Sequence, residues 1–303
     1  MALWSLEWAW APWGLTRPTY GAVPSEDEIL TCLDRAFEAG ATFCDSAGQI
    51  SKAGCIREII GKWFKRTGGR NGIFIATKFG YVKNSLTLDI NTSYEYTKQA
   101  YYLHIPDPNT LIEETMRALK ELQDEGKIKY IGLSYIGDSI FELYCKVKKG
   151  THILNTYREL GVTVVAAIPL GRGLLTTNFI EETVPGQQDN DIRYQLIPRF
   201  ICENREKNIQ LVSQSKELAD KKGITTAQLA IAWLLKQGDE VIPIPGTKKI
   251  KYFEDNWAAL EIALSDEEEA EIRSFVEKAD VAGVPLPRVL YGWMLRDTKE
   301  ETS

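Results

Sequence analysis

The sequence has few of the residues that build metal sites or disulfide frameworks. It contains two histidines and five cysteines, and no pair of cysteines has the C-x-x-C spacing of a metal or redox motif. An odd number of scattered cysteines argues against a disulfide framework and indicates a reducing compartment. We therefore expect no bound metal and a cytoplasmic location. The cysteines are Cys32, Cys44, Cys55, Cys145 and Cys202.

The sequence also lacks an excess of positive charge and any hydrophobic run long enough to cross a membrane. The formal net charge is −6, which gives no reason to expect nucleic acid or an anionic membrane as the main partner. Residues 1–13, MALWSLEWAWAPW, are rich in tryptophan but too short to span a bilayer, and they carry no basic segment of a signal peptide. We interpret them as an apolar cap on the core, with an interfacial membrane anchor as the alternative.

Strands and helices are predicted to alternate through most of the chain. Residues 41–80 read as an apolar strand ATFCDSA, an amphipathic helix IREIIGKWFKRTG and a second apolar strand NGIFIATKFG. This alternation without a linker predicts one α/β domain over residues 1–303, a β/α barrel with a disordered tail at 297–303. A doubly wound sheet is the alternative fold. It is disfavoured because no Gly-rich turn of the dinucleotide-binding kind follows the first strand.

Caps and apolar periodicity give the expected boundaries. Ser25 and Glu28 form a capping box, and Gly40 is expected to end the helix that they begin. Residues 178–204 are polar and predict a long loop of the kind that lies over a barrel mouth. The other predicted helices are 56–65, 109–125, 138–149, 151–161, 207–222, 226–237, 248–260 and 265–278, and the other predicted strands are 101–104, 127–134, 162–168 and 240–246.

Three apolar runs end on residues that can do chemistry. Asp45, Lys78 and His104 each follow a predicted strand. A parallel strand buried on both faces is apolar throughout, so a charge at its end marks the carboxyl rim of the sheet. In a β/α barrel that rim carries the active site. We expect Asp45 and Lys78 to form an ion pair, because an unpaired buried charge is costly. By itself, His104 would be interpreted as a core histidine rather than a catalytic residue.

Four groups of motifs carry a resemblance to a known family. They are FCDSA with IFIATKFG, YYLH with IEETMRALKELQDEGKIKYIGLS, PLGRGLL, and PIPGTKKIKYFEDN. Together they resemble the aldo-keto reductases, in particular the fungal and bacterial branch that reduces aldehydes and ketones. The resemblance covers about residues 14–280, and residues 1–13 match poorly. It implies a (β/α)8 TIM barrel, NADPH as the cofactor and a small-molecule carbonyl substrate, with a role in secondary metabolism.

The resemblance also implies a catalytic tetrad of Asp, Tyr, Lys and His. Asp45, Lys78 and His104 match three members: the Asp pairs with the Lys, the Lys lowers the pKa of the Tyr phenol, and the His orients the carbonyl. The fourth position is Ile50, which has no proton to give. Four tyrosines are alternative acids, although we favour an ordinary core or rim role for each: Tyr20, Tyr81, Tyr101 and Tyr102.

The family's cofactor residues are matched in three places. PLGRG matches the backbone cradle for the pyrophosphate, and Ser134 matches a residue that holds the nicotinamide carboxamide. IPGTKK matches the site of the adenosine 2′-phosphate, and two lysines beside a helix N-terminus suit a phosphate, although a solvated helix start is the alternative. The implied cofactor residues are Ser134, Leu170, Gly171, Gly173, Gly246, Thr247, Lys248, Lys249, Asp255 and Asn256.

The chain departs from the family pattern at several points. Ala167 stands where a tyrosine stacks on the nicotinamide, and the strand expected between Lys149 and Thr151 is absent. Most of a helix before Tyr101 is missing as well. Losing a strand leaves an open edge or forces rearrangement, so the barrel could be incomplete. A mis-spliced gene model or a decaying copy would explain these gaps. The alternative to a reductase is a catalytically impaired pseudo-enzyme that binds a dinucleotide or a protein partner.

Overall fold

The computed structural model describes nine stretches of the chain, and every structural statement below concerns them. They are residues 9–10, 15–16, 20–47, 56–80, 90–97, 103–105, 107–134, 152–181 and 191–287. Strands and helices alternate through these stretches, as the sequence predicts. None of the described helices is both long enough and apolar enough to cross a membrane.

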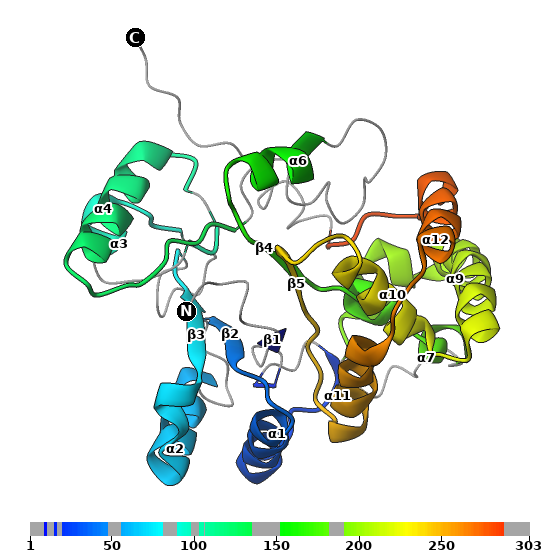
Figure 1. The fold of residues 1–303 in the computed structure, drawn as a ribbon, viewed down its shortest axis with the longest axis horizontal. Coiled ribbons are helices and arrows are strands. Elements are labelled where there is room, and N and C mark those ends of the chain that lie inside the picture. The colour runs from blue at the N-terminus through cyan, green and yellow to red at the C-terminus, as the bar shows by residue number, and fades with distance from the viewer. Residues whose placement is uncertain are drawn as a thin grey trace.

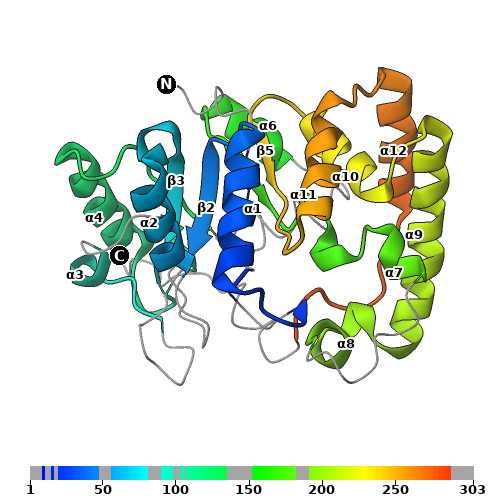
Figure 2. The same ribbon diagram turned by 90° about the horizontal axis from the view of Figure 1, so that it is seen from below.

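The strands form an arc with helices outside it. β1 (Ala9–Trp10), β2 (Phe43–Ala47) and β3 (Phe74–Lys78) pair in parallel in that order, and β4 (Val164–Ala167) pairs in parallel with β5 (Val241–Ile244). β1 also contacts β5, so the arc runs β3-β2-β1-β5-β4 (Figure 1). In Figure 2, β2 points toward the edge of the molecule where α8 lies. The carboxyl ends of the parallel strands therefore face that edge.

The helices surround the arc on its outer side (Figure 1). Three of them begin with a capping box: the predicted Ser25 and Glu28 box, and those of Thr225 with Gln228 and Ser265 with Glu268. Their bounds are α1 (Glu26–Glu38), α2 (Ile56–Thr67), α3 (Tyr94–Thr97), α4 (Ile112–Asp124), α6 (His152–Glu159), α7 (Thr177–Glu181), α8 (Arg193–Leu196), α9 (Cys202–Lys222), α10 (Thr226–Leu235), α11 (Ile250–Trp257) and α12 (Asp266–Lys278).

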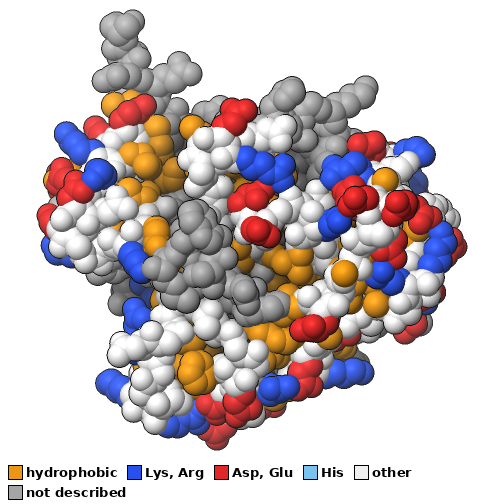
Figure 3. Space-filling model, viewed as in Figure 1, with side chains coloured by type: hydrophobic (Ala, Val, Ile, Leu, Met, Phe, Trp, Pro, Cys, Tyr) orange, Lys and Arg blue, Asp and Glu red, His pale blue; other side chains and the backbone are white. Residues whose placement is uncertain are grey.

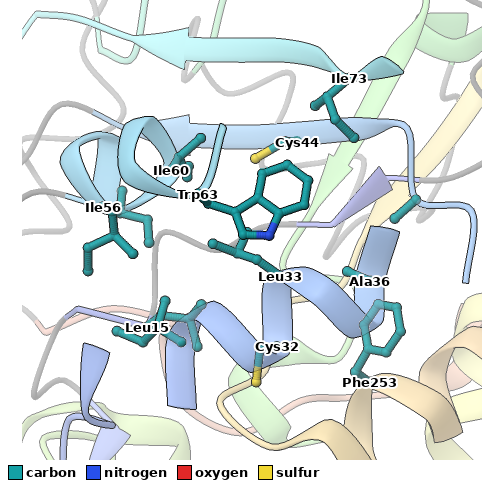
Figure 4. Packing of buried hydrophobic residues seen from close by; sticks show 13 residues of the cluster. Leu15, Cys32, Leu33, Ala36, Cys44, Ile56, Ile60, Trp63, Ile73 and Phe253 are labelled. Atoms are coloured by element: carbon teal, nitrogen blue, oxygen red, sulfur yellow. The ribbon is translucent and has the colours of Figure 1, made fainter. Parts of the chain in front are cut away.

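One hydrophobic core lies between the outer face of β2 and the helices α1, α2 and α11 (Figure 4). Trp63 of α2 is 3% exposed, and it packs with Leu33 of α1 and Cys44 of β2. The inner face of the arc has its own cluster around Phe43 and Ile244. Neighbouring residues of a strand point to opposite faces, so Cys44 lies outside, while Phe43 and Asp45 lie inside the barrel. This alternation aims the Asp45 carboxylate at the interior.

Two sequence predictions are wrong in the described residues. Residues 127–134, expected as a strand, form no ladder; the backbone N–H of Leu103 donates to the carbonyl of Gly132 at 3.2 Å. Residues 178–204, expected as a loop, contain most of α7, all of α8, a 3-10 turn at Pro198–Phe200 and the start of α9. Of the strand expected at 101–104, the structure describes residues 103 and 104, and Leu103 forms a parallel bridge with Phe79.

Other expectations lie outside the described residues. These are the helix at 138–149, the absent strand near Lys149, the gap before Tyr101 and the tail at 297–303. The helix expected at 151–161 is α6, and the strands expected at 162–168 and 240–246 are β4 and β5 with shorter bounds.

Candidate active site

An ion pair between Asp45 and Lys78 lies inside the barrel. The two residues come from neighbouring strands, and the register pairs Asp45 with Ala76 and Ala47 with Lys78. Asp45 is 1% exposed and Lys78 is 9% exposed. The Lys78 ammonium contacts the Oδ2 of Asp45 and approaches the carbonyl of Ser46 at 3.5 Å. The ion pair forms as expected, because a buried charge without a partner of opposite sign costs several kcal/mol of stability.

The Asp45 carboxylate is only partly satisfied. Burial raises its pKa, although the charge and the hydrogen bond of Lys78 act in the opposite direction. Its Oδ1 has no hydrogen-bond partner in the described part of the chain. Burial also raises the pKa of the neighbouring Cys44 thiol to about 12, and the Asp45 charge adds to that effect. The site therefore contains a buried acceptor oxygen beside a fixed positive charge.

His104 follows the same edge of the sheet. Its backbone N–H donates to the carbonyl of Phe79 at 2.8 Å, and Phe79 is the residue after Lys78. The backbone thus places His104 beside the end of β3, as expected for a third residue at the rim. Ile50, at the position of the family's tyrosine, lies outside the described residues, and so do Tyr81, Tyr101 and Tyr102.

The PLGRG motif forms a tight turn after β4. Gly171, Arg172 and Gly173 have φ values of 57°, 65° and 92°, all in the left-handed region. A Cβ on Gly173 would lie 2.6 Å from the Nη1 of Arg193, so a side chain there would displace that guanidinium. Leu170 precedes the turn. Within the turn, the N–H groups of Gly171 and Gly173 donate to the carbonyls of Ile168 and Leu170, each at 2.9 Å.

Arg193 holds this turn in place. Its guanidinium donates to the carbonyl of Arg172 at 2.8 Å and pairs with Asp191 at 2.6 Å. It also lies over the rings of Tyr20 and Phe200, at 5.3 Å and 5.7 Å from their centroids. Burial alone would lower the pKa of Arg193, but Asp191 outweighs it and raises the pKa above its ordinary value. The sequence analysis missed this arginine, because only the fold brings it to the turn.

The two lysines of IPGTKK face different surroundings. The Lys248 ammonium donates to the carbonyls of Tyr20, Gly21 and Ala22 at 3.4, 3.2 and 3.0 Å, and burial lowers its pKa. Lys249 is exposed at the start of α11, where its ammonium lies 5.6 Å from the centroid of the Tyr252 ring. Lys248 therefore anchors the N-terminal loop, and Lys249 is the lysine of the motif that faces solvent.

The remaining residues of this motif connect elements to one another. Thr247 accepts a hydrogen bond from the backbone N–H of Lys249 at 3.2 Å, and Gly246 is exposed. Asp255 accepts hydrogen bonds from Thr225 at 3.3 Å through its carboxylate and from Gln228 through its carbonyl, which ties α11 to α10. Asn256 is 6% exposed.

A cavity of about 1210 Å3 adjoins the ion pair. It brings together four of the predicted residues: Asp45, Lys78, Ser134 and Gly171. The other candidates are not among its described lining residues. Arg172, between the two glycines of PLGRG, lines it too. An arginine inside a glycine turn is a signal that the sequence analysis could have used.

Comparisons with known proteins give one family. The family model described as "Aldo/keto reductase family" matches residues 4–277. The chain is 40% identical over 311 residues to aldo-keto reductase str7 of Strobilurus tenacellus, covering 93% of this chain and 90% of that protein. It is 36% identical over 298 residues to aldo-keto reductase yakc, named with NADP(+), of Schizosaccharomyces pombe, covering 87% and 86%.

Solved structures resemble the fold. The glycerol dehydrogenase AKR11B4 from Gluconobacter oxydans superposes with a TM-score of 0.72 at 22% identity, covering 93% of each chain. The holo form of aldo-keto reductase AKR11C1 from Bacillus halodurans gives a TM-score of 0.66 at 22% identity, covering 92% of this chain and 93% of that one. This likeness shows the shared fold, an (α/β)8 barrel.

Proposed function

The chain belongs to the aldo/keto reductase family, and from that premise we propose that it reduces an aldehyde or ketone to an alcohol with NADPH. The observation that carries the proposal is the buried Asp45–Lys78 pair, which borders a large cavity together with Ser134 and Gly171. A fixed ammonium in a site of low dielectric stabilises the negative charge that develops on a carbonyl oxygen as it is reduced.

The residues around the cavity fit the phosphate-bearing part of the cofactor. The turn at Gly171–Gly173 has no side chain at either glycine, which suits close approach of a pyrophosphate to the backbone. The N–H groups of Gly171 and Gly173 donate to the carbonyls of Ile168 and Leu170, so the glycines contribute space rather than hydrogen bonds. Lys249, at the N-terminus of α11, suits the 2′-phosphate, and Ser134 suits the carboxamide. When bound, NADPH supplies the hydride. The relative yakc is named with NADP(+), which supports the choice of dinucleotide.

A reductase also needs a proton donor, and Ile50 stands where the family has its tyrosine. Lys78 sets a positive potential at the carbonyl oxygen, and His104 orients the carbonyl. Ile50 cannot donate a proton, and the Tyr20 hydroxyl accepts a hydrogen bond from Arg172 at 2.7 Å. We therefore propose that water or another tyrosine supplies the proton. A positioned general acid is worth about 10²–10⁴ in rate, so turnover should be slow.

A second candidate is a pseudo-enzyme that binds a dinucleotide or a protein partner without turnover. Ala167 favours it, because this exposed residue at the end of β4 lines the cavity where the family's tyrosine would stack on the nicotinamide. Ile50 favours it as well. Both candidates bind the phosphates of the dinucleotide, and they differ in whether a reaction follows binding.

An NADPH titration followed by quenching of tryptophan fluorescence tests the first step. Saturable micromolar binding, weaker for NADH, is expected if the 2′-phosphate is recognised. The variant Lys249→Ala should lower the affinity for NADPH but not for NADH. The matched control is Lys251→Ala, which removes the lysine at the second residue of α11. Absence of binding by the folded protein would remove both dinucleotide proposals.

Restoring the missing phenol tests the second step. The variant Ile50→Tyr should raise carbonyl reduction by about 10²-fold or more if the proton is the limiting defect. Binding of NADPH without reduction by either protein would favour the pseudo-enzyme. A gain in the variant alone would locate the defect at this position.

The location of the protein, its biological role and the completeness of its barrel can each be tested. We propose a cytoplasmic location, which imaging of a tagged chain tests, and a role in secondary metabolism, which deletion of the gene followed by metabolite profiling tests. We also propose that the barrel lacks a strand between Lys149 and Thr151. Full-length transcript sequencing tests whether this reading frame is the one the cell translates.

A further inference from the structure

The cavity beside the ion pair extends far beyond a small carbonyl site. Its volume of about 1210 Å3 includes the places proposed above for the cofactor, at Ser134 and Gly171, and continues beyond them. Asp45 and Lys78 line one part of it, and Trp233 of α10 and Phe275 of α12 line another. Helices α10 and α12 lie outside the arc of strands (Figure 1). The cavity therefore connects the barrel interior with its outer layer.

The connection passes around β4. Val165 packs inside the barrel with Phe43, while Val164 and Ala166 pack outside against Tyr157 of α6. All of these residues line the same cavity. A space that touches both faces of one strand goes past that strand's edge or its end. In the described residues β4 pairs with β5 on one side, and the lining runs without a break from Val162 to Pro169, so we place the passage along its other edge.

The opposite wall is the segment that forms no ladder. Residues 131–134 are consecutive and all line the cavity, so this segment also meets it along an edge. The passage continues down the interior to Tyr130 and Arg70, near the start of β3. In a packed barrel, layers of side chains fill this space. Here Ala76, on the inner face of β3, lines the cavity with a side chain of a single methyl group.

The lining is mostly apolar. Met116, Ile131, Leu133, Val165 and Phe275 belong to it, and apolar side chains gather near the centre of the face shown in Figure 3, among charged ones toward its rim. A polar ligand would lose its hydration here without replacement hydrogen bonds. An apolar chain gains about 0.8 kcal/mol for each methylene that it buries, which is about fourfold in affinity.

We propose that the substrate is a carbonyl compound with a long unbranched apolar chain, whose carbonyl lies at Lys78 and whose chain passes the edge of β4 toward α12. This inference rests on the proposed function for the identity of the reacting group. The chain-binding passage itself follows from the cavity and does not depend on turnover.

A binding series tests the passage without cofactor or reaction. Primary alcohols from butanol to decanol are titrated against the protein by calorimetry. Affinity should rise about fourfold per methylene over most of the series. A rise that stops at butanol or pentanol would overturn the proposal, because a chain confined to the space beside Lys78 gains nothing from further length.

A pair of matched variants locates the chain. Phe275 is half-buried in the cavity wall, so Phe275→Asp should weaken decanol binding at least tenfold and butanol binding much less. Leu196 is 53% exposed and is not among the lining residues, so Leu196→Asp is the control and should change neither affinity. If Phe275→Asp fails to fold, Phe275→Ser carries the same test. Equal losses for both alcohols, or no loss, would overturn the proposed path.

Kinetics separate this inference from the proposed function. With NADPH, the kcat/KM for decanal should exceed that for butanal, and Phe275→Asp should reverse the order. Reduction of butanal without any chain-length preference would overturn the passage and leave the reductase standing. Chain-length-dependent alcohol binding without reduction of any aldehyde would leave the passage standing and remove the reductase.

Discussion

Arg172 donates a hydrogen bond of 2.7 Å to the hydroxyl of Tyr20, a residue 152 positions earlier in the chain. The Lys248 ammonium donates hydrogen bonds to carbonyls of the same loop, and the Arg193 guanidinium lies over the Tyr20 ring. Residues 20–22 are therefore held by the two segments that we propose to bind the cofactor. Any change at Tyr20 should reach the turn at Gly171–Gly173.

The variant Tyr20→Phe tests this connection. It removes the hydroxyl but keeps the ring under Arg193, so stability should fall by about 0.5–1.5 kcal/mol, the value of one hydrogen bond. NADPH should bind less tightly, because the turn at Gly171–Gly173 loses a support. Urea unfolding and the fluorescence titration measure the two effects. Unchanged cofactor binding would mean that the turn holds its shape without Tyr20.

The variant Lys78→Met tests the buried pair. It leaves the Asp45 carboxylate without its partner, which should cost about 3–5 kcal/mol at neutral pH. The double variant Asp45→Asn with Lys78→Met removes both charges and should recover part of that loss. Urea unfolding of the four proteins gives the coupling energy between the residues. A double variant no more stable than Lys78→Met would show that shape, rather than charge, dominates the site.

The thiol of Cys44 predicts a pH dependence. Its pKa is raised from 9.0 to about 12 in the folded protein, so the folded state keeps the proton longer than the unfolded state does. This contribution to stability is complete below pH 9 and is lost as the pH rises from 9 to about 12, by about 1.4 kcal/mol per pH unit. The variant Cys44→Ala should lack this part of the slope. Parallel curves for both proteins between pH 8 and 10.5 would contradict the assignment.

Gly173 and Gly126 form a matched pair of substitutions. Both have positive φ values, 92° and 70°, but a Cβ at Gly126 meets nothing within 4 Å, whereas at Gly173 it meets Arg193 at 2.6 Å. Gly126→Ala should cost roughly 1–2 kcal/mol from backbone strain alone. Gly173→Ala should cost more and also weaken NADPH binding. Thermal unfolding and titration of both variants measure the difference, and equal losses would mean that Arg193 moves aside freely.

The sequence predicts the parts of the fold in which local chemistry and tertiary structure agree. β2 is buried and β3 is partly buried, and both are mostly apolar. The charged residues Asp45 within β2 and Lys78 at the end of β3 therefore stand out in the sequence, so the ion pair could be predicted before any contact was known. The capping boxes at Ser25 and Ser265 are local hydrogen bonds and need no tertiary information.

Other parts could not be predicted because different structures share one pattern. Ile128, Ile131 and Leu133 are apolar since they pack against α4, and burial against a helix cannot be told from burial in a ladder by composition. In residues 178–204, Phe179 and Phe200 anchor short helices to α9, but the polar residues between them indicated a loop. The place of Arg193 beside Tyr20 depends entirely on the fold.

The Lys248 contact to the carbonyl of Ala22 spans 226 residues. β1 likewise lies beside β5, which begins at Val241. Forming such contacts requires closing a loop of about three quarters of the chain, and folds rich in distant contacts form slowly. A ribosome must therefore finish most of this protein before its first strand can meet its last. Until then the nascent chain carries an open sheet edge, and its folding yield in the cell should depend on how quickly that edge is covered.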